Sequence, residues 1–410
     1  MGNNLEKIKA RDGFSSKLGF TIACIGSAVG MGNIWLFPYK VGENGGAAFL
    51  VPYFIFVVLL GVSGIVGEIT LGRSMKTGPL GAFKKAMEIR GLKGGGILGM
   101  IPVIGAVAIA VGYTVVMAWI LKFVVGSFSG SMMNAENSGQ YFGEIVGSFG
   151  AVKWHIIVIA VTFCLMVFGI SKGIEKVNKF MMPAFFVMFV ILAVRVYFLP
   201  GAEKGYDFLF NPNWAVLKKP MTWVYALGQA FFSLSLAGSG TVVYGSYVSE
   251  KEDIVSSAKY VAFFDTLAAM VAGLVIIPAV FAFNVDHAAG PPLMFITMPS
   301  IFKMMPLGQL MAIIFFVAVM FAGFTSLVNL YETHIEALQN SRRNYSHHRI
   351  DSRVVHRAGR CAFKMDGYSF SIYHTSGSFA CGSYDLLDLW KRLCQEPCSN
   401  GKGKANWQVV

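Results

Sequence analysis

The sequence predicts an all-α polytopic membrane protein of about eight spans, with an inverted-repeat transporter fold in which helices 1 and 6 are discontinuous. Of its 410 residues, 55% are hydrophobic and only 14% are charged, and the mean hydropathy of +0.59 lies above that of soluble domains. Apolar runs long enough to cross a bilayer occupy eight ranges: 17–40, 46–70, 98–126, 154–171, 180–200, 222–247, 255–283 and 307–338.

Two of these runs are interrupted by glycine-rich stretches, GSAVGMGN at 26–33 and SLSLAGSG at 233–240. Hydrocarbon offers no water to a backbone that gives up helical hydrogen bonds, so such a stretch must line a protected cavity. Two breaks five spans apart are typical of secondary transporters whose ligand site lies between inverted repeats. Gly26 and Gly30 alone would also fit a close helix–helix contact. A third glycine, the polar Asn33 and the second break favour the cavity.

The distribution of lysine and arginine indicates a cytoplasmic N-terminus. The 71–96 loop carries six basic residues and the 172–179 loop three, whereas 127–153 carries one. Short cytoplasmic loops accumulate these residues, so the net charge of +12 needs no nucleic-acid partner. The first apolar run lacks a signal-peptide cleavage site and is expected to stay in the protein. We expect a multi-pass protein of the cell membrane.

The chain changes character near residue 340, so the predicted transporter core is 1–340 and the tail is 341–410. The tail has no spanning run, yet it holds four of the six cysteines and four of the seven histidines. A poorly ordered basic tail and out-of-frame sequence behind a truncated core both fit this composition. A zinc site that combines Cys394 and Cys398 with His347 or His348 is a further alternative, disfavoured because paired CxxC units are absent.

Several polar side chains lie inside the apolar runs, where each is costly in lipid and must face the bundle interior or a cavity. Asp265 lies near the middle of the seventh run, too deep to reach water by snorkelling. Glu68 lies closer to the cytoplasmic end and could either pair with Arg73 or face the cavity. The full set is Asn33, Glu68, Gln229, Asp265 and Asn329.

Oxygen atoms for a hard cation are available around the breaks. Half-helix N-termini beside the breaks would present amides to a carboxylate. One site could therefore hold a zwitterion and a cation, each improving the binding of the other. The oxygen donors are the freed carbonyls of Gly26, Ala28 and Val29 with the side chains of Asn33, Ser233, Asp265, Thr325 and Ser326.

Five stretches resemble the bacterial branch of the neurotransmitter:sodium symporter family, and two of the longer ones are specific enough to identify it. The resemblance covers about residues 8–340. It implies a symporter, not an enzyme, that imports an amino acid with sodium by alternating access. The stretches are RDGF at 11–14, GSAVGMGNIWLFP at 26–38, ENGG at 43–46, GQAFFSLSL at 228–236 and AGFTS at 322–326.

The resemblance also implies roles for individual residues. A first sodium site would use Ala28, Asn33, Ser233 and Asp265, and a second Gly26, Val29, Ala322, Thr325 and Ser326. The substrate carboxylate would meet Met31, Gly32 and Tyr113, and the amine would meet Ala28, Phe232, Ser233 and Ser235. The side-chain pocket would comprise Ile109, Tyr113, Phe232, Gly238 and Leu330. Tyr113 and Phe232 would close the outer gate, and the inner gate would involve Arg11, Phe14 and Tyr247.

Departures from the family pattern qualify these expectations. Leu36 replaces the outer-gate arginine, and Asn340 replaces the acid that pairs with Arg11, so both gates lack a charge pair. Asp265 replaces an asparagine, and Ala269 replaces the serine of chloride-dependent relatives. A fixed carboxylate there could supply the negative charge of chloride, which predicts that chloride is not required.

Two further expectations concern the substrate and the completeness of the core. Gly238 stands where relatives have a bulky residue, which favours a large hydrophobic or aromatic amino acid. The family core has ten spans, so the alternative to a transporter is a truncated membrane protein that keeps sodium and amino-acid binding without transport, or completes itself as a homo-oligomer. The chain lacks a nucleophile with a base, a His-rich metal motif and a phosphate loop, which disfavours an enzyme.

Overall fold

A computed structural model describes residues 13–147, 149–283 and 293–347, with side chains to residue 340. These residues fold into helices, and no strand occurs among them. They belong to the first of two units, Met1–Arg349, and the second unit, Ile350–Val410, lies outside the described residues. The predicted inner-gate residue Arg11 and the cysteines of the tail lie outside them as well.

Five helices are long and apolar enough to cross a membrane, and a sixth span is a pair of helices bent by 47°. The bent pair consists of α1 (Lys17–Ala28) and the π-helical η1 (Gly32–Leu36) with α2 (Phe37–Glu43). The five long helices are Ala47–Met75 (α3, η2 and α4), α6 (Gly95–Ser129), Ile170–Tyr197 (η3 and α10), α14 (Ile254–Ala282) and Gly308–Asn340 within α16 (Gly308–His347).

The two remaining predicted spans are helical but differ in form. The fourth is α9 (Val152–Val167), an apolar helix of 16 residues. The sixth is divided into α12 (Pro220–Ser233) and α13 (Gly240–Ser246). The prediction of a multi-pass, all-α membrane fold with discontinuous first and sixth helices is confirmed.

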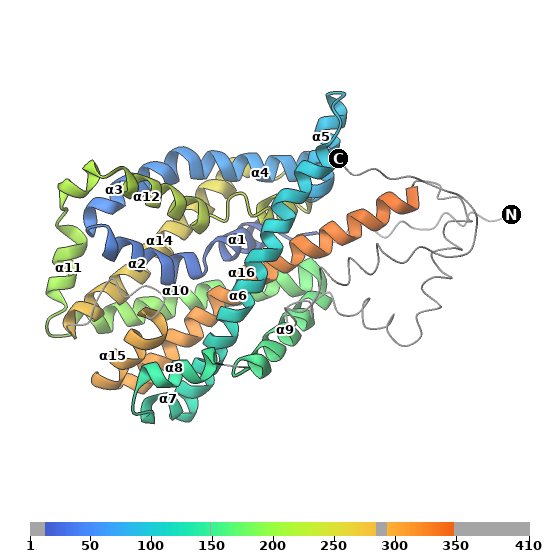
Figure 1. Cartoon of the computed structure of the whole chain (residues 1–410). Helices are drawn as coiled ribbons and strands as arrows, with labels where there is room; N and C mark the ends of the chain where they lie inside the picture. Colours follow the sequence, from blue (N-terminus) through green and yellow to red (C-terminus); the bar gives the residue numbers. More distant parts are fainter. Residues whose placement is uncertain (1–12, 148, 284–292, 348–410) are drawn as a thin grey trace, which may run out of the picture. The chain divides into compact units, whose positions relative to one another are not determined.

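Shorter helices connect the spans. The helix α5 lies beside the start of α6, whereas α7, α8, α11 and α15 lie towards the other ends of the spans (Figure 1). Their bounds are α5 Pro79–Ile89, α7 Ser131–Asn134, α8 Ser138–Val146, α11 Glu203–Phe210, η4 Trp214–Lys218, η5 Leu293–Thr297 and α15 Met298–Met304.

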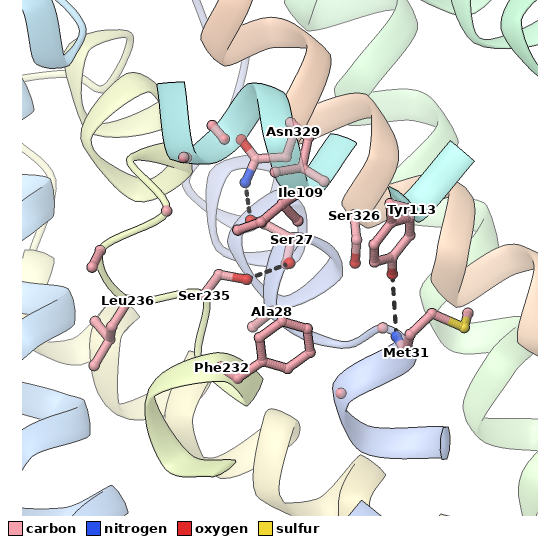
Figure 2. Close-up of a pocket in the computed structure, with 18 residues that line it drawn as sticks. Ser27, Ala28, Met31, Ile109, Tyr113, Phe232, Ser235, Leu236, Ser326 and Asn329 are labelled. Atoms are coloured by element: carbon pink, nitrogen blue, oxygen red, sulfur yellow. Dashed lines mark hydrogen bonds between the residues drawn. The ribbon is translucent and has the colours of Figure 1, made fainter. Parts of the chain in front are cut away.

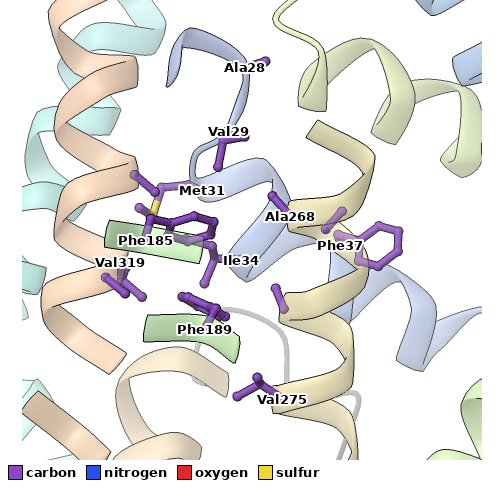
Figure 3. Packing of buried hydrophobic residues seen from close by; sticks show 14 of the residues in the cluster. Ala28, Val29, Met31, Ile34, Phe37, Phe185, Phe189, Ala268, Val275 and Val319 are labelled. Atoms are coloured by element: carbon purple, nitrogen blue, oxygen red, sulfur yellow. The ribbon is translucent and has the colours of Figure 1, made fainter. Parts of the chain in front are cut away.

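The first span runs through the interior, where it contacts α10, α14 and α16. Figure 3 shows Val29, Met31 and Ile34 of this span among apolar side chains of the neighbouring helices. Phe185 and Phe189 of α10 are completely buried there. Lipid tails are as apolar as these side chains, so the packing stabilises the bundle through close van der Waals contact. This packing fixes the position of the first break.

Two glycines bring the first span close to its neighbours. A Cβ atom added to Gly26 would lie 1.9 Å from Oδ1 of Asn178, and one added to Gly30 would lie 2.6 Å from the hydroxyl of Tyr113. The α-helix ends at Ala28, and the chain becomes helical again only near Gly32. The same short stretch therefore makes a close helix contact and breaks the helix.

The second break holds an unusual backbone conformation. Ser235, Ala237 and Ser239 have φ angles of 54°, 62° and 64°. Left-handed conformations of residues other than glycine cost about 1–3 kcal/mol each and persist only where the surroundings enforce them. Glu68 of α4 contributes, because its carboxylate accepts hydrogen bonds from the Ala237 amide at 2.7 Å and from the Thr241 hydroxyl.

Candidate functional site

A cavity of about 220 Å³ lies between the two helix breaks. It is bounded by the first span, α6, the α12–α13 break and α16 (Figure 2). Nine of the ten predicted substrate positions line it: Ala28, Met31, Gly32, Ile109, Tyr113, Phe232, Ser235, Gly238 and Leu330. The tenth, Ser233, is completely buried outside the lining.

The cavity is lined by apolar side chains on one part of its surface and by polar groups at the two helix breaks. Ile109 of α6, Phe232 of α12 and Leu330 of α16 supply apolar surface. At the first break, the Met31 amide donates a hydrogen bond to the Tyr113 hydroxyl at 3.1 Å. The Ser235 hydroxyl donates to the carbonyl of Ser27 at 3.0 Å, which joins the two breaks. This arrangement suits a ligand with one polar end and an apolar side chain.

Asn33, Ser233 and Asp265 form a fully buried polar cluster beside the cavity. The Asn33 amide group donates to the Ser233 hydroxyl at 3.0 Å and to Oδ1 of Asp265 at 2.8 Å. The Ser233 hydroxyl donates to Oδ2 of Asp265 at 2.8 Å. Among the described residues, none of the ion pairs includes Asp265. A buried carboxylate without a cationic partner is costly, and a bound cation would supply the missing charge.

A second group of oxygen atoms lies where α16 crosses the first break. The Ser326 hydroxyl lies 3.1 Å from the Val29 carbonyl and 3.3 Å from the carbonyls of Gly26 and Ala322. The Thr325 hydroxyl donates to the Ala322 carbonyl at 2.9 Å. Three carbonyls and two hydroxyls thus converge, and such neutral oxygen ligands suit a hard cation.

Comparisons with known proteins match this chain to a family. The model of the sodium:neurotransmitter symporter family matches residues 11–146 and 136–380. The chain belongs to this family. It is a multi-pass protein of the cell membrane, and the predicted family resemblance is confirmed.

Individual sodium-dependent transporters and one solved structure are also similar to this chain. The sodium-dependent transporter YhdH of Bacillus subtilis is 36% identical over 322 residues, which cover 78% of this chain and 70% of that protein. The mouse sodium-dependent neutral amino acid transporter B(0)AT3 is 30% identical over 295 residues, 65% of this chain and 47% of the mouse protein. The crystal structure of MhsT in complex with L-phenylalanine has a TM-score of 0.73 and 38% identity, covering 79% of this chain and 73% of MhsT.

In this symporter family member, Glu68 faces the second break and not Arg73. Its carboxylate accepts from the Ala237 amide at 2.7 Å, whereas Arg73 donates to the Glu252 carbonyl at 2.7 Å. Of the two alternatives for Glu68, pairing with Arg73 is therefore wrong. Gln229 similarly binds a break, because its side-chain amide donates to the Gly32 carbonyl at 2.9 Å.

Two of the predicted inner-gate residues, Phe14 and Tyr247, make aromatic and polar contacts. The ring of Phe14 packs edge-on against Tyr244 with centroids 5.4 Å apart, and the Tyr247 hydroxyl donates to Glu332 at 2.7 Å. The two predicted outer-gate residues, Tyr113 and Phe232, both line the cavity, and Phe232 is 45% exposed.

Two polar residues that belong to none of the predicted ligand sets, Ser27 and Asn329, also line the cavity. Asn329 donates a hydrogen bond to the Ser27 hydroxyl, and both side chains line the cavity (Figure 2). A sequence signal existed for both, because Asn329 is a polar residue within an apolar run and Ser27 lies inside the first break. Their mutual contact depends on how α16 crosses the first span.

Proposed function

We propose that this family member couples the inward movement of Na⁺ to the uptake of an amino acid by alternating access. The strongest support is that two cation-suited oxygen clusters and a ligand-sized cavity share the two helix breaks. Ser326 belongs to the second oxygen cluster and also lines the cavity, so ion and solute binding would order the same segment. Shared ordering of one segment makes the binding of each favour the other.

Two sodium ions are assigned as transported substrates. The first would bind the Ala28 carbonyl and the side chains of Asn33, Ser233 and Asp265. The Asn33 amide would turn its oxygen towards the ion and give up its hydrogen bonds to the other side chains. Because Asp265 already supplies a negative charge, transport would not require chloride. The second ion would bind the carbonyls and hydroxyls of Gly26, Val29, Ala322, Thr325 and Ser326.

The proposed solute is a large hydrophobic or aromatic amino acid. Its carboxylate would bind the amides at Met31 and Gly32 and the Tyr113 hydroxyl, and its amine would meet Ala28, Phe232, Ser233 and Ser235. A Cβ atom at Gly238 would approach only the Ser235 carbonyl, at 3.3 Å, so this position leaves room beside the apolar wall. The neutral amino acid named for B(0)AT3 and the phenylalanine bound to MhsT support this class of substrate.

The transport cycle would need gates on both sides of the cavity. Tyr113 and Phe232 would close the outer side, and Phe14 and Tyr247, together with Arg11, would close the inner side. We assign the transporter core to residues 1–340 and treat 341–410 as a separate tail.

Uptake into proteoliposomes tests the proposal. The full chain would be assayed with labelled phenylalanine, leucine and glycine under an inward Na⁺ gradient, with Asn33→Ala as the variant that removes a ligand of the first ion. We expect gradient-driven accumulation of phenylalanine, loss of that accumulation in Asn33→Ala, and no change when gluconate replaces chloride. Sodium-dependent binding without accumulation would refute transport and identify a protein that binds but does not transport.

A further inference from the structure

A groove separate from the cavity lies in the segment that the distribution of lysine and arginine predicts to be cytoplasmic, distant in sequence from both helix breaks. It is formed by α5 and the start of α6 and has a volume of about 470 Å³. Figure 1 shows α5 beside the N-terminal end of α6. The groove is lined by Leu80, Lys84, Glu88, Leu92, Lys93, Gly94, Gly95, Gly96, Ile97 and Met100.

Close packing fixes the two walls of the groove. A Cβ atom added to Gly95 would lie 2.5 Å from the Phe83 carbonyl oxygen, and one added to Gly99 would lie 2.8 Å from the Leu80 Cα. In contrast, a Cβ atom at Gly96 would meet nothing within 4 Å. The groove is therefore an open space beside a rigid contact between α5 and α6.

The charge of the groove is positive. Lys84 and Lys93 line it, and the carboxylate among the lining residues is that of Glu88, which lies 4.0 Å from the Lys84 ammonium group. The Lys84 and Glu88 side chains are 43% and 59% exposed, and exposed pairs of this kind contribute little stability. Both lysines thus remain available to an anion.

Apolar surface continues from the groove along α6. Ile97 and Ile101 are 72% and 63% exposed, and Leu92 at the mouth is 53% exposed. In a spanning helix this surface faces acyl chains, while the lysines lie at headgroup depth where the spans end. Cationic grooves between helices on this side of a membrane suit anionic lipid headgroups.

We propose that the groove binds the headgroup phosphate of an anionic glycerophospholipid of the cytoplasmic leaflet. The phosphate lies between Lys84 and Lys93, and the acyl chains run along the exposed face of α6. The bound lipid joins α5 to the start of the span whose middle carries Ile109 and Tyr113 of the cavity.

Native mass spectrometry of the full chain in detergent tests this site with phosphatidylglycerol and phosphatidylcholine of identical acyl chains. We expect preferential retention of one phosphatidylglycerol, and about thirtyfold weaker retention in Lys84→Gln/Lys93→Gln. The matched control is Lys172→Gln/Lys176→Gln, which removes two exposed charges from the other loop predicted to be cytoplasmic. Equal losses in both double variants would overturn the proposal, because they would indicate diffuse surface charge. Equal retention of phosphatidylcholine would overturn it as well.

A steric variant tests the groove without changing its charge. Gly96→Leu would fill the open space, and we expect it to lose the retained lipid, whereas Gly112→Leu, at another open glycine of the same helix, would keep it. Displacement of the lipid by sn-glycerol 3-phosphate at equal concentration would show a free-phosphate site and refute the lipid assignment. If Gly96→Leu does not fold, the lysine variants decide. Lipid retention is measured without transport, so its outcome is independent of the proposed uptake.

Discussion

Asp265 offers the sharpest test of how this chain binds sodium. Its carboxylate is completely buried and accepts two side-chain hydrogen bonds of 2.8 Å, from Asn33 and Ser233. The substitution Asp265→Asn preserves the volume and one oxygen ligand and removes the negative charge. The size of its effect on sodium affinity therefore measures the contribution of that charge.

The magnitude follows from elementary electrostatics. A unit charge about 4 Å from the carboxylate gains about 4 kcal/mol at an effective dielectric constant near 20. The amide oxygen of the introduced asparagine would recover about half of this as a neutral ligand, which leaves a loss of about 2 kcal/mol. We therefore expect the sodium concentration for half-maximal uptake to rise about thirtyfold.

The assay is initial-rate uptake of labelled phenylalanine across a sodium titration at constant ionic strength. Asp207→Asn is the matched control, because it makes the same chemical change at an exposed position of α11. The charge argument also predicts that Asp265→Asn/Ala269→Ser acquires stimulation by chloride. A sodium dependence within about twofold of the unmodified chain in Asp265→Asn would refute the carboxylate as a ligand of the ion.

Three further variants test the cavity and the two breaks. Gly238→Leu should shrink the cavity. When unlabelled phenylalanine and alanine compete with the labelled substrate for uptake, we expect the preference for phenylalanine over alanine to fall about tenfold. An unchanged preference would contradict the volume argument. Glu68→Gln should weaken two charge-assisted hydrogen bonds to the second break and destabilise the fold by about 1–2 kcal/mol, measured as a lower melting temperature in detergent. Gly26→Ala should destabilise the fold by about 1–3 kcal/mol, because the added methyl group overpacks against Asn178. The control is Gly67→Ala, where a Cβ atom meets nothing within 4 Å. It should leave the melting temperature unchanged or raise it.

Residue types and their spacing were enough to predict the fold class. Long apolar runs can only be helices in lipid, and the glycine-rich stretches within the first and sixth runs located both breaks. Gly26 shows the limit of such reasoning, because the sequence offered a helix contact or a cavity wall as alternatives. The structure shows that the same short stretch serves both purposes.

The family resemblance predicted which residues line the cavity, and the polar residues within apolar runs were expected to face the interior. Asp265 and Asn33 were expected to meet, and they lie 2.8 Å apart through Oδ1 and Nδ2. The partner of Glu68 was not predictable, because Arg73 is nearer in sequence and the Ala237 amide becomes available only where the helix breaks.

The sequence by itself determined that this chain spans the membrane, where its helices break and which polar groups face inward, because hydropathy and helix geometry are local properties. Tertiary structure alone decided the left-handed conformations of Ser235 and Ala237, since neither residue type favours them. It also decided the contact of Asn329 with Ser27 and the lysine-lined groove beside α6. These features depend on the separation and crossing of helices distant in sequence, which packing of the whole bundle fixes.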